Sequence, residues 1–267
     1  MLIPPNITAN IDGEADIKQQ MTLFKQSKLD MFFSHSVYNQ SLFEHYLEDK
    51  DPFRMTVVRE PNDRFRSGYF WGRYLVETNR SNLAGFVCGD IENYREWVQK
   101  CQFVAKASQV MYMTPRDWRR STRAKTVFRH YDHVVVTARF YESLLTLMPK
   151  LGLRLEEVLA LSSKSHPGSK ALDEFTEADQ VEFDRLVRQR IGETDKDYVF
   201  YQMALAKLDR EFEALPQEMK DAVPDIQQMY REVDEACSTK RRPCVYTGIG
   251  CGRECIDEWV QEHVHCR

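Results

Sequence analysis

The stretch that decides the fold, residues 55–71, reads MTVVREPNDRFRSGYFW. It begins inside FRMTVVR, residues 53–59, where β-branched side chains and apolar character on both faces predict a buried strand of a parallel sheet. Pro61 suits the first turn of a helix, where its missing N–H costs no hydrogen bond. The stretch therefore predicts a strand that ends on Arg59 and passes directly into a helix that carries Ser67.

Strand patterns and helix patterns alternate along the rest of the chain. LDMFFSH, residues 29–35, predicts a short buried strand that ends on His35, and YDHVVVTARF, residues 131–140, predicts a second one. Helical patterns cover residues 15–28, 39–49, 90–109 with Asp90 as its cap, 141–152 with Gly152 at its end, and most of 175–236. Strands that alternate with helices predict an α/β fold with a small parallel sheet, in which helix outweighs strand.

Length and charge narrow the class of protein. The 267 residues fit one large domain, predicted here as 1–236, with a short Cys-rich tail at 237–267. A net charge of −4 argues against a dedicated nucleic-acid binder, although residues 114–130 form a local basic run that attracts anions or simply covers a helix surface. No stretch approaches the ~18 apolar residues of a membrane span, and the first residues lack the pattern of a signal peptide.

The cysteines raise the question of a disulfide or a metal. Five of the seven lie in residues 237–267, at spacings that contain no Cys-x2-Cys pair. Zinc and free thiols stay open, but this pattern favours disulfides formed in an oxidising lumen. Three Asn-x-Ser/Thr sequons, at Asn6, Asn39 and Asn79, would be used only in such a compartment.

Two basic side chains mark the expected ligand edge of the sheet. Ligands of parallel sheets gather at the carboxyl ends of the strands, where both His35 and Arg59 are predicted to lie. Arg59 offers a bidentate fork to a phosphate, Ser67 adds a hydroxyl, and Arg64 is an alternative donor. The competing interpretation is an ordinary strand-to-helix turn with solvated arginines.

The residues of this turn also carry a resemblance to a known family. VVREPNDRFRSGYFW resembles the 3′-phosphate-binding segment of Golgi carbohydrate sulfotransferases, whose pattern is Arg-(Asp/Glu)-Pro-x-x-Arg-Phe-x-Ser-x-(Tyr/Phe). Within that superfamily the chain looks most like the galactose-3-O-sulfotransferase (galactosylceramide sulfotransferase) family. Three further segments are similar to that family. FFSHSVYN resembles its His-x-x-(Phe/Tyr)-Asn segment, and HVVVTARFYESLLTLMPKLG resembles a strand followed by a Glu-Ser-Leu helix. The third, DKDYVFYQMALAKLDREFEAL, resembles its Asp-x-x-x-Tyr helix. The resemblance runs from about residue 29 to residue 213.

The resemblance implies a P-loop-NTPase-like sulfotransferase fold and transfer of a sulfuryl group from 3′-phosphoadenosine 5′-phosphosulfate to a sugar hydroxyl. The acceptor would be galactose, at its 3-hydroxyl, in a glycolipid or glycoprotein glycan in the Golgi, and no metal is expected. Arg59 and Ser67, with Arg64 as an alternative, would hold the 3′-phosphate. His35 would be the general base, which suits an imidazole because its pKa lies near the working pH. Weaker assignments place Arg120 and Lys125 near an anionic acceptor or the nucleotide. Glu142 matches the glutamate of the Glu-Ser-Leu segment, and a role at the site and a helix-cap role stay open for it.

One part of the family pattern has no match in this sequence. Family members begin with a membrane anchor, a strand and a Lys-(Ser/Thr)-rich loop that grips the 5′-phosphosulfate, whereas nothing before Asp30 matches that loop. We therefore expect a fold that is shortened at its N-terminus, and the activity of the chain stays open. The alternatives are a non-catalytic relative that binds nucleotide or glycan, and a helical interaction protein with its partner surface on residues 175–236.

Overall fold

The computed structural model describes residues 53–78, 88–101, 109–114, 123–160, 174–192, 195–237 and 253–263. Within these ranges the protein is mostly helical and contains a two-stranded parallel sheet, β1 (Met55–Val58) and β2 (His133–Val136), in the register Met55↔His133 to Val58↔Val136. The α/β class, the parallel pairing and the excess of helix over strand are confirmed. The predicted strand at 29–35 and the helices at 15–28 and 39–49 lie outside the described residues.

The β1 strand passes into helix α3 (Pro61–Glu77) as predicted. Pro61 occupies the first turn, and the Glu60 carboxylate accepts the N–H of Asp63 at 2.8 Å, which caps the helix. Val58 is buried, but Val57 is 51% exposed, so the expectation of burial on both faces of this strand is wrong. The reason is the alternation of side chains along a strand: the core packs on the face that carries Val58.

The second strand and its helix occur in the predicted order, but the strand predicted over 131–140 is limited to 133–136. All four residues of β2 are buried, and a short 3-10 turn, η2 (Thr137–Arg139), leads into α9 (Phe140–Leu151). Gly152 ends α9 with φ 63°, a left-handed conformation that favours glycine. Ser143 ties the strand to the helix, because its Oγ accepts the N–H of Val136 at 3.0 Å and donates to the carbonyl of Arg139 at 2.9 Å.

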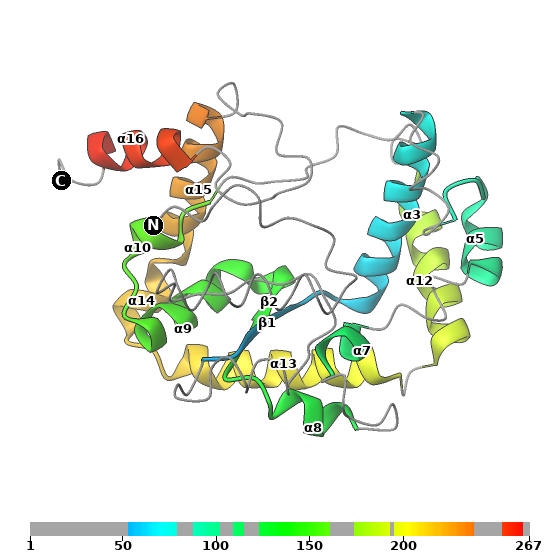
Figure 1. Ribbon diagram of the computed structural model, residues 1–267, viewed down its shortest axis with the longest axis horizontal. Coiled ribbons are helices and arrows are strands. Elements are labelled where there is room, and N and C mark those ends of the chain that lie inside the picture. The colour runs from blue at the N-terminus through cyan, green and yellow to red at the C-terminus, as the bar shows by residue number, and fades with distance from the viewer. Residues whose placement is uncertain are drawn as a thin grey trace, which may run out of the picture.

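Helix α13 (Lys196–Glu213) organises the central core. It runs along the sheet (Figure 1) and packs with β2, α9, α7 (Gln109–Met113) and α8 (Ala124–Phe128). The core here joins strand residues Val58, Val134 and Val136 to helix residues that include Phe200 and Leu208. The α13 helix therefore lies against the same sheet whose carboxyl edge holds Arg59.

A second core lies among α3, α5 (Tyr94–Lys100) and α12 (Glu177–Ile191), and it overturns one prediction. The expected helix over 90–109 starting at Asp90 is wrong, because Asp90 lies in a turn and α5 begins after Asn93, whose side chain accepts the N–H of Arg95 at 2.9 Å. Helix α5 ends before Cys101, which has extended backbone and forms a disulfide with Cys88. The disulfide therefore closes the segment that contains α5.

The C-terminal part forms a third, smaller core. Helices α10 (Leu155–Val158), α14 (Gln217–Asp221), α15 (Val223–Cys237) and α16 (Arg253–His263) belong to this region, and Leu159, Val233 and Trp259 are among its buried residues. The predicted disulfide in the tail is confirmed for Cys237 and Cys255. The three other tail cysteines lie outside the described residues. None of the described helices combines the length and the apolar character that crossing a bilayer requires.

Candidate functional site

Arg59 lies at the carboxyl end of β1, as predicted, and its backbone is fixed by α7. The N–H of Arg59 donates to Oε1 of Gln109 at 2.9 Å, and Nε2 of Gln109 donates to the carbonyl of Arg59 at 2.7 Å. The Arg59 side chain is exposed, and no hydrogen bond or ion pair engages its guanidinium in the described part of the chain. The structure thus holds the main chain of Arg59 at the carboxyl edge of the sheet and leaves its guanidinium without a partner among the described residues.

Ser67 lies in the second turn of α3 and is half-buried. The helical period places it on the side of α3 away from the stripe of buried residues that includes Phe65, Tyr69 and Gly72. Its hydroxyl has no hydrogen bond within the described ranges, and none joins it to Arg59. Both groups therefore remain available for a ligand. Because Glu60 already occupies the N-terminus of α3, an anion here would be bound by side chains.

Arg64 is engaged in the structure itself. Its Nη2 lies 3.1 Å from Oδ2 of Asp197, and the side chains of the two residues are 15% and 1% exposed. The same carboxylate accepts the N–H groups of Gln109 at 2.8 Å and of Val110 at 2.9 Å. Arg64 thus neutralises a buried charge, and a phosphate would have to compete with Asp197 for it.

Sequence reasoning missed Asp197, although a signal for it exists. Asp197 and Tyr201 form the Asp-x-x-x-Tyr pattern, and both residues are buried in the first turns of α13. A carboxylate that is 1% exposed requires charged or hydrogen-bonding partners, and these come from α3 and α7. Asp197 therefore joins α3, α7 and α13 next to the turn that carries Arg59.

Glu142 lies at the carboxyl end of the other strand, in the first turn of α9. Its carboxylate accepts Nε of Arg139 at 2.9 Å, and Arg139 also pairs with Asp209 of α13. The hydrogen bond that Arg139 donates to Glu142 is the main cause that raises the pKa of Arg139 above its usual range. The ion pair of Arg139 with Glu142 and the hydrogen bonds of Ser143 stabilise the turn from β2 into α9. The Glu-Ser-Leu segment therefore has a structural role.

Of the remaining predicted site residues, the structure describes Lys125. Lys125 is exposed on α8, which packs chiefly against α13. Arg120 and His35 lie outside the described residues. The structure therefore brings Arg59, Ser67 and Arg64 to one strand–helix unit and leaves the proposed base without a described position.

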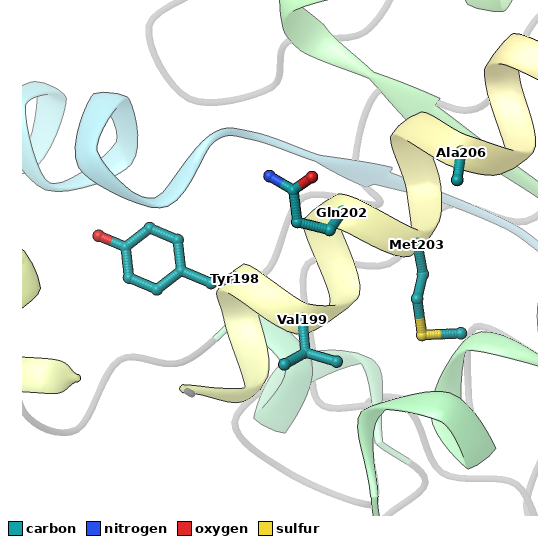
Figure 2. A pocket seen from close by; sticks show the side chains of 5 residues that line it. All are labelled: Tyr198, Val199, Gln202, Met203 and Ala206. Atoms are coloured by element: carbon teal, nitrogen blue, oxygen red, sulfur yellow. The ribbon is translucent and has the colours of Figure 1, made fainter. Parts of the chain in front are cut away.

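A shallow hollow of about 380 Å³ lies on the outer face of α13, lined by Tyr198, Val199, Gln202, Met203 and Ala206. Figure 2 shows Val199 and Met203 pointing to one side of the helix and Gln202 to the other. At one end of the hollow, the hydroxyl of Tyr198 donates to Oδ1 of Asn62 at 2.5 Å, in the first turn of α3. Burial raises the pKa of Tyr198 above its usual range. The lining carries no charged group, so it adds no anion-binding chemistry to Arg59.

His133 begins β2 and therefore lies at the amino ends of the two parallel strands, whereas Arg59 lies at their carboxyl ends. It is fully buried, with Nε2 at 3.2 Å from the carbonyl of Ser143 and Nδ1 at 3.2 Å from Nζ of Lys150. Burial is the main cause that lowers the pKa of His133 to about 4, and the positive charge of Lys150 is the second cause. His133 is therefore a neutral structural histidine with a proton on Nε2.

No group of three or more His, Cys, Asp or Glu side chains suited to a metal ion occurs in the described ranges. Comparisons of the chain with protein-family models, with curated proteins and with solved structures found no match.

Proposed function

We propose that this chain binds the 3′-phosphate of an adenosine nucleotide at Arg59 and acts as a carbohydrate sulfotransferase with a P-loop-NTPase-like fold. One observation carries the proposal: at the carboxyl end of a parallel strand, an arginine with a fixed backbone has an exposed guanidinium without an intramolecular partner in the described part of the chain. Ser67, in the helix that follows, supplies a hydroxyl at the spacing of the family motif, and this hydroxyl has no partner within the described ranges. A guanidinium fork matches the geometry of a phosphate.

The proposed reaction transfers a sulfuryl group from 3′-phosphoadenosine 5′-phosphosulfate. The oxygen of a sugar hydroxyl attacks the sulfur atom while the bond from sulfur to the bridging phosphate oxygen breaks. The products are a sulfate ester and adenosine 3′,5′-bisphosphate, and the hydroxyl proton passes to His35. Arg59 and Ser67 orient the nucleotide through its 3′-phosphate, away from the reacting atoms.

The acceptor and the location follow from the family resemblance. The proposed acceptor is the 3-hydroxyl of galactose in a glycolipid or glycoprotein glycan, with Arg120 and Lys125 attracting anionic groups. The Golgi lumen is the proposed location, and the disulfides Cys88–Cys101 and Cys237–Cys255 support an oxidising compartment. Arg64 and Glu142 are assigned to structural ion pairs rather than to the ligand.

Isothermal titration with two nucleotides tests the proposal. We expect the chain to bind adenosine 3′,5′-bisphosphate about 10- to 100-fold more tightly than adenosine 5′-monophosphate, the range expected for charge-assisted hydrogen bonds to the extra phosphate. Arg59→Ala should abolish this preference and Ser67→Ala should reduce it. The control Arg231→Ala, which removes an exposed arginine of α15 that bonds Gln228, should leave it unchanged. Equal affinity for the two nucleotides would refute the proposal.

A second assay separates an enzyme from a non-catalytic nucleotide-binding relative. Labelled sulfate should pass from 3′-phosphoadenosine 5′-phosphosulfate to a galactoside, and His35→Ala should abolish the transfer while nucleotide binding stays nearly intact. Nucleotide binding without transfer would assign the chain to the non-catalytic class. A chain that binds neither nucleotide would fit the helical interaction protein.

A further inference from the structure

Gln109 makes two hydrogen bonds to the main chain of Arg59. Its side-chain amide accepts the N–H of Arg59 at 2.9 Å and donates to the carbonyl of the same residue at 2.7 Å. The two hydrogen bonds form a closed pair, as between two strands of a sheet, although Gln109 belongs to a helix. Such a pair fixes both the position and the rotation of the Arg59 peptide units.

Gln109 is in turn placed by Asp197. The buried carboxylate accepts the N–H of Gln109 at 2.8 Å and the N–H of Val110 at 2.9 Å, so it fixes the first residues of α7. Its charge is balanced by Arg64 of α3, at 3.1 Å. A continuous set of hydrogen bonds therefore runs from the first turn of α13 through α7 to the end of β1.

We infer that Gln109, held by Asp197, is a positioning residue that sets the direction of the Arg59 guanidinium toward the 3′-phosphate. This inference rests on the proposed function. Arg59 has no side-chain partner of its own among the described residues, so its orientation before binding depends on its backbone. A bidentate contact requires both N–H groups to meet two phosphate oxygens, and it weakens when the backbone turns. Neither Gln109 nor Asp197 contacts the nucleotide in this arrangement.

The experiment measures how strongly each variant prefers adenosine 3′,5′-bisphosphate over adenosine 5′-monophosphate by isothermal titration. Gln109→Met keeps the length of the side chain and removes both hydrogen bonds to Arg59. We expect it to reduce the preference by about three- to tenfold, as expected for the loss of roughly one hydrogen bond. The matched control Gln99→Met changes an exposed glutamine of α5 and should keep the wild-type preference.

The affinities for the two nucleotides, taken separately, distinguish positioning from a general loss of structure. If Gln109 acts through Arg59, Gln109→Met should weaken the binding of adenosine 3′,5′-bisphosphate and leave the binding of adenosine 5′-monophosphate nearly unchanged. A purely structural role would weaken both nucleotides equally and leave their ratio unchanged. Asp197→Asn gives a second test of the inference. It should lower the preference for adenosine 3′,5′-bisphosphate by a similar factor, while circular dichroism shows that the protein remains folded.

The outcomes distinguish the two proposals. If the wild-type chain shows no preference for the 3′-phosphate, the proposed function fails and this inference fails with it. If the wild-type chain shows the preference and Gln109→Met retains it in full, the inference alone is overturned. A preference that falls in Gln109→Met, while the affinity for adenosine 5′-monophosphate is retained, supports the inference.

Discussion

The ion pair of Arg64 and Asp197 gives the most direct test of how the strand–helix unit is held. Asp197→Asn keeps the shape of the side chain but removes the charge that balances Arg64, and it turns an amide toward backbone N–H groups that need an acceptor. Breaking a buried ion pair by removing one partner typically costs 3–5 kcal/mol. We expect the lower end, about 3 kcal/mol, because asparagine retains one acceptor oxygen and Arg64 is 15% exposed.

Urea unfolding at constant pH, with the disulfides intact, measures this loss. The control Asp195→Asn changes the neighbouring N-cap of α13, which accepts the N–H of Asp197 at 2.8 Å, and should cost well under ~1 kcal/mol because asparagine caps a helix about as well as aspartate. A cycle with Arg64→Met should give a coupling of about 1–3 kcal/mol between the two side chains. A loss for Asp197→Asn no larger than that of the control, or a coupling near zero, would refute the reasoning.

Three further predictions concern stability. Lowering the pH from 7 to 5 should lower the free energy of unfolding by about 2 kcal/mol through His133. Over this range the imidazole takes up a proton only in the unfolded chain, because its pKa in the folded protein is about 4. In urea titrations at the two pH values, His133→Gln should no longer show this share of the loss. Gly89→Ala should lower the free energy of unfolding by about 1–3 kcal/mol, since an added Cβ would overlap the carbonyl of Gly72, and an unchanged urea midpoint would contradict this close approach. Replacing Cys88 and Cys101 by serine should lower the free energy of unfolding by about 3 kcal/mol, the value that loop entropy gives for a sequence separation of 13. A smaller loss would mean that the chain without the disulfide keeps this loop closed.

The parts of the fold that the sequence predicts correctly depend on local signals. The β-branched run before Arg59, the proline at the start of α3 and the glycine after α9 each fix the backbone through neighbouring residues. The helix over 90–109 failed because its limits are set by the Asn93 cap and by the disulfide of Cys101 with Cys88. A disulfide partner cannot be read from spacing alone, since several pairings satisfy the same count.

The site was predictable to a similar extent. The position of Arg59 followed from the end of an apolar run, at the carboxyl end of β1. The engagement of Arg64 was not predictable, because its partner Asp197 lies 133 residues away in the sequence. Gln109 was missed for the same reason: a glutamine in an ordinary helical pattern carries no sign that its amide bonds a distant backbone.

Helix α13 has a consequence for how the protein is made. The strand residues 55–58 and 133–136 share their core with residues of α13, at 196–213, so the two strands leave the ribosome well before the helix that covers them. Such long-range contacts slow folding, and the apolar faces of both strands stay open to other chains during synthesis. Nascent chains that stop before residue 196 should accordingly engage chaperones, and those that extend beyond residue 213 should release them.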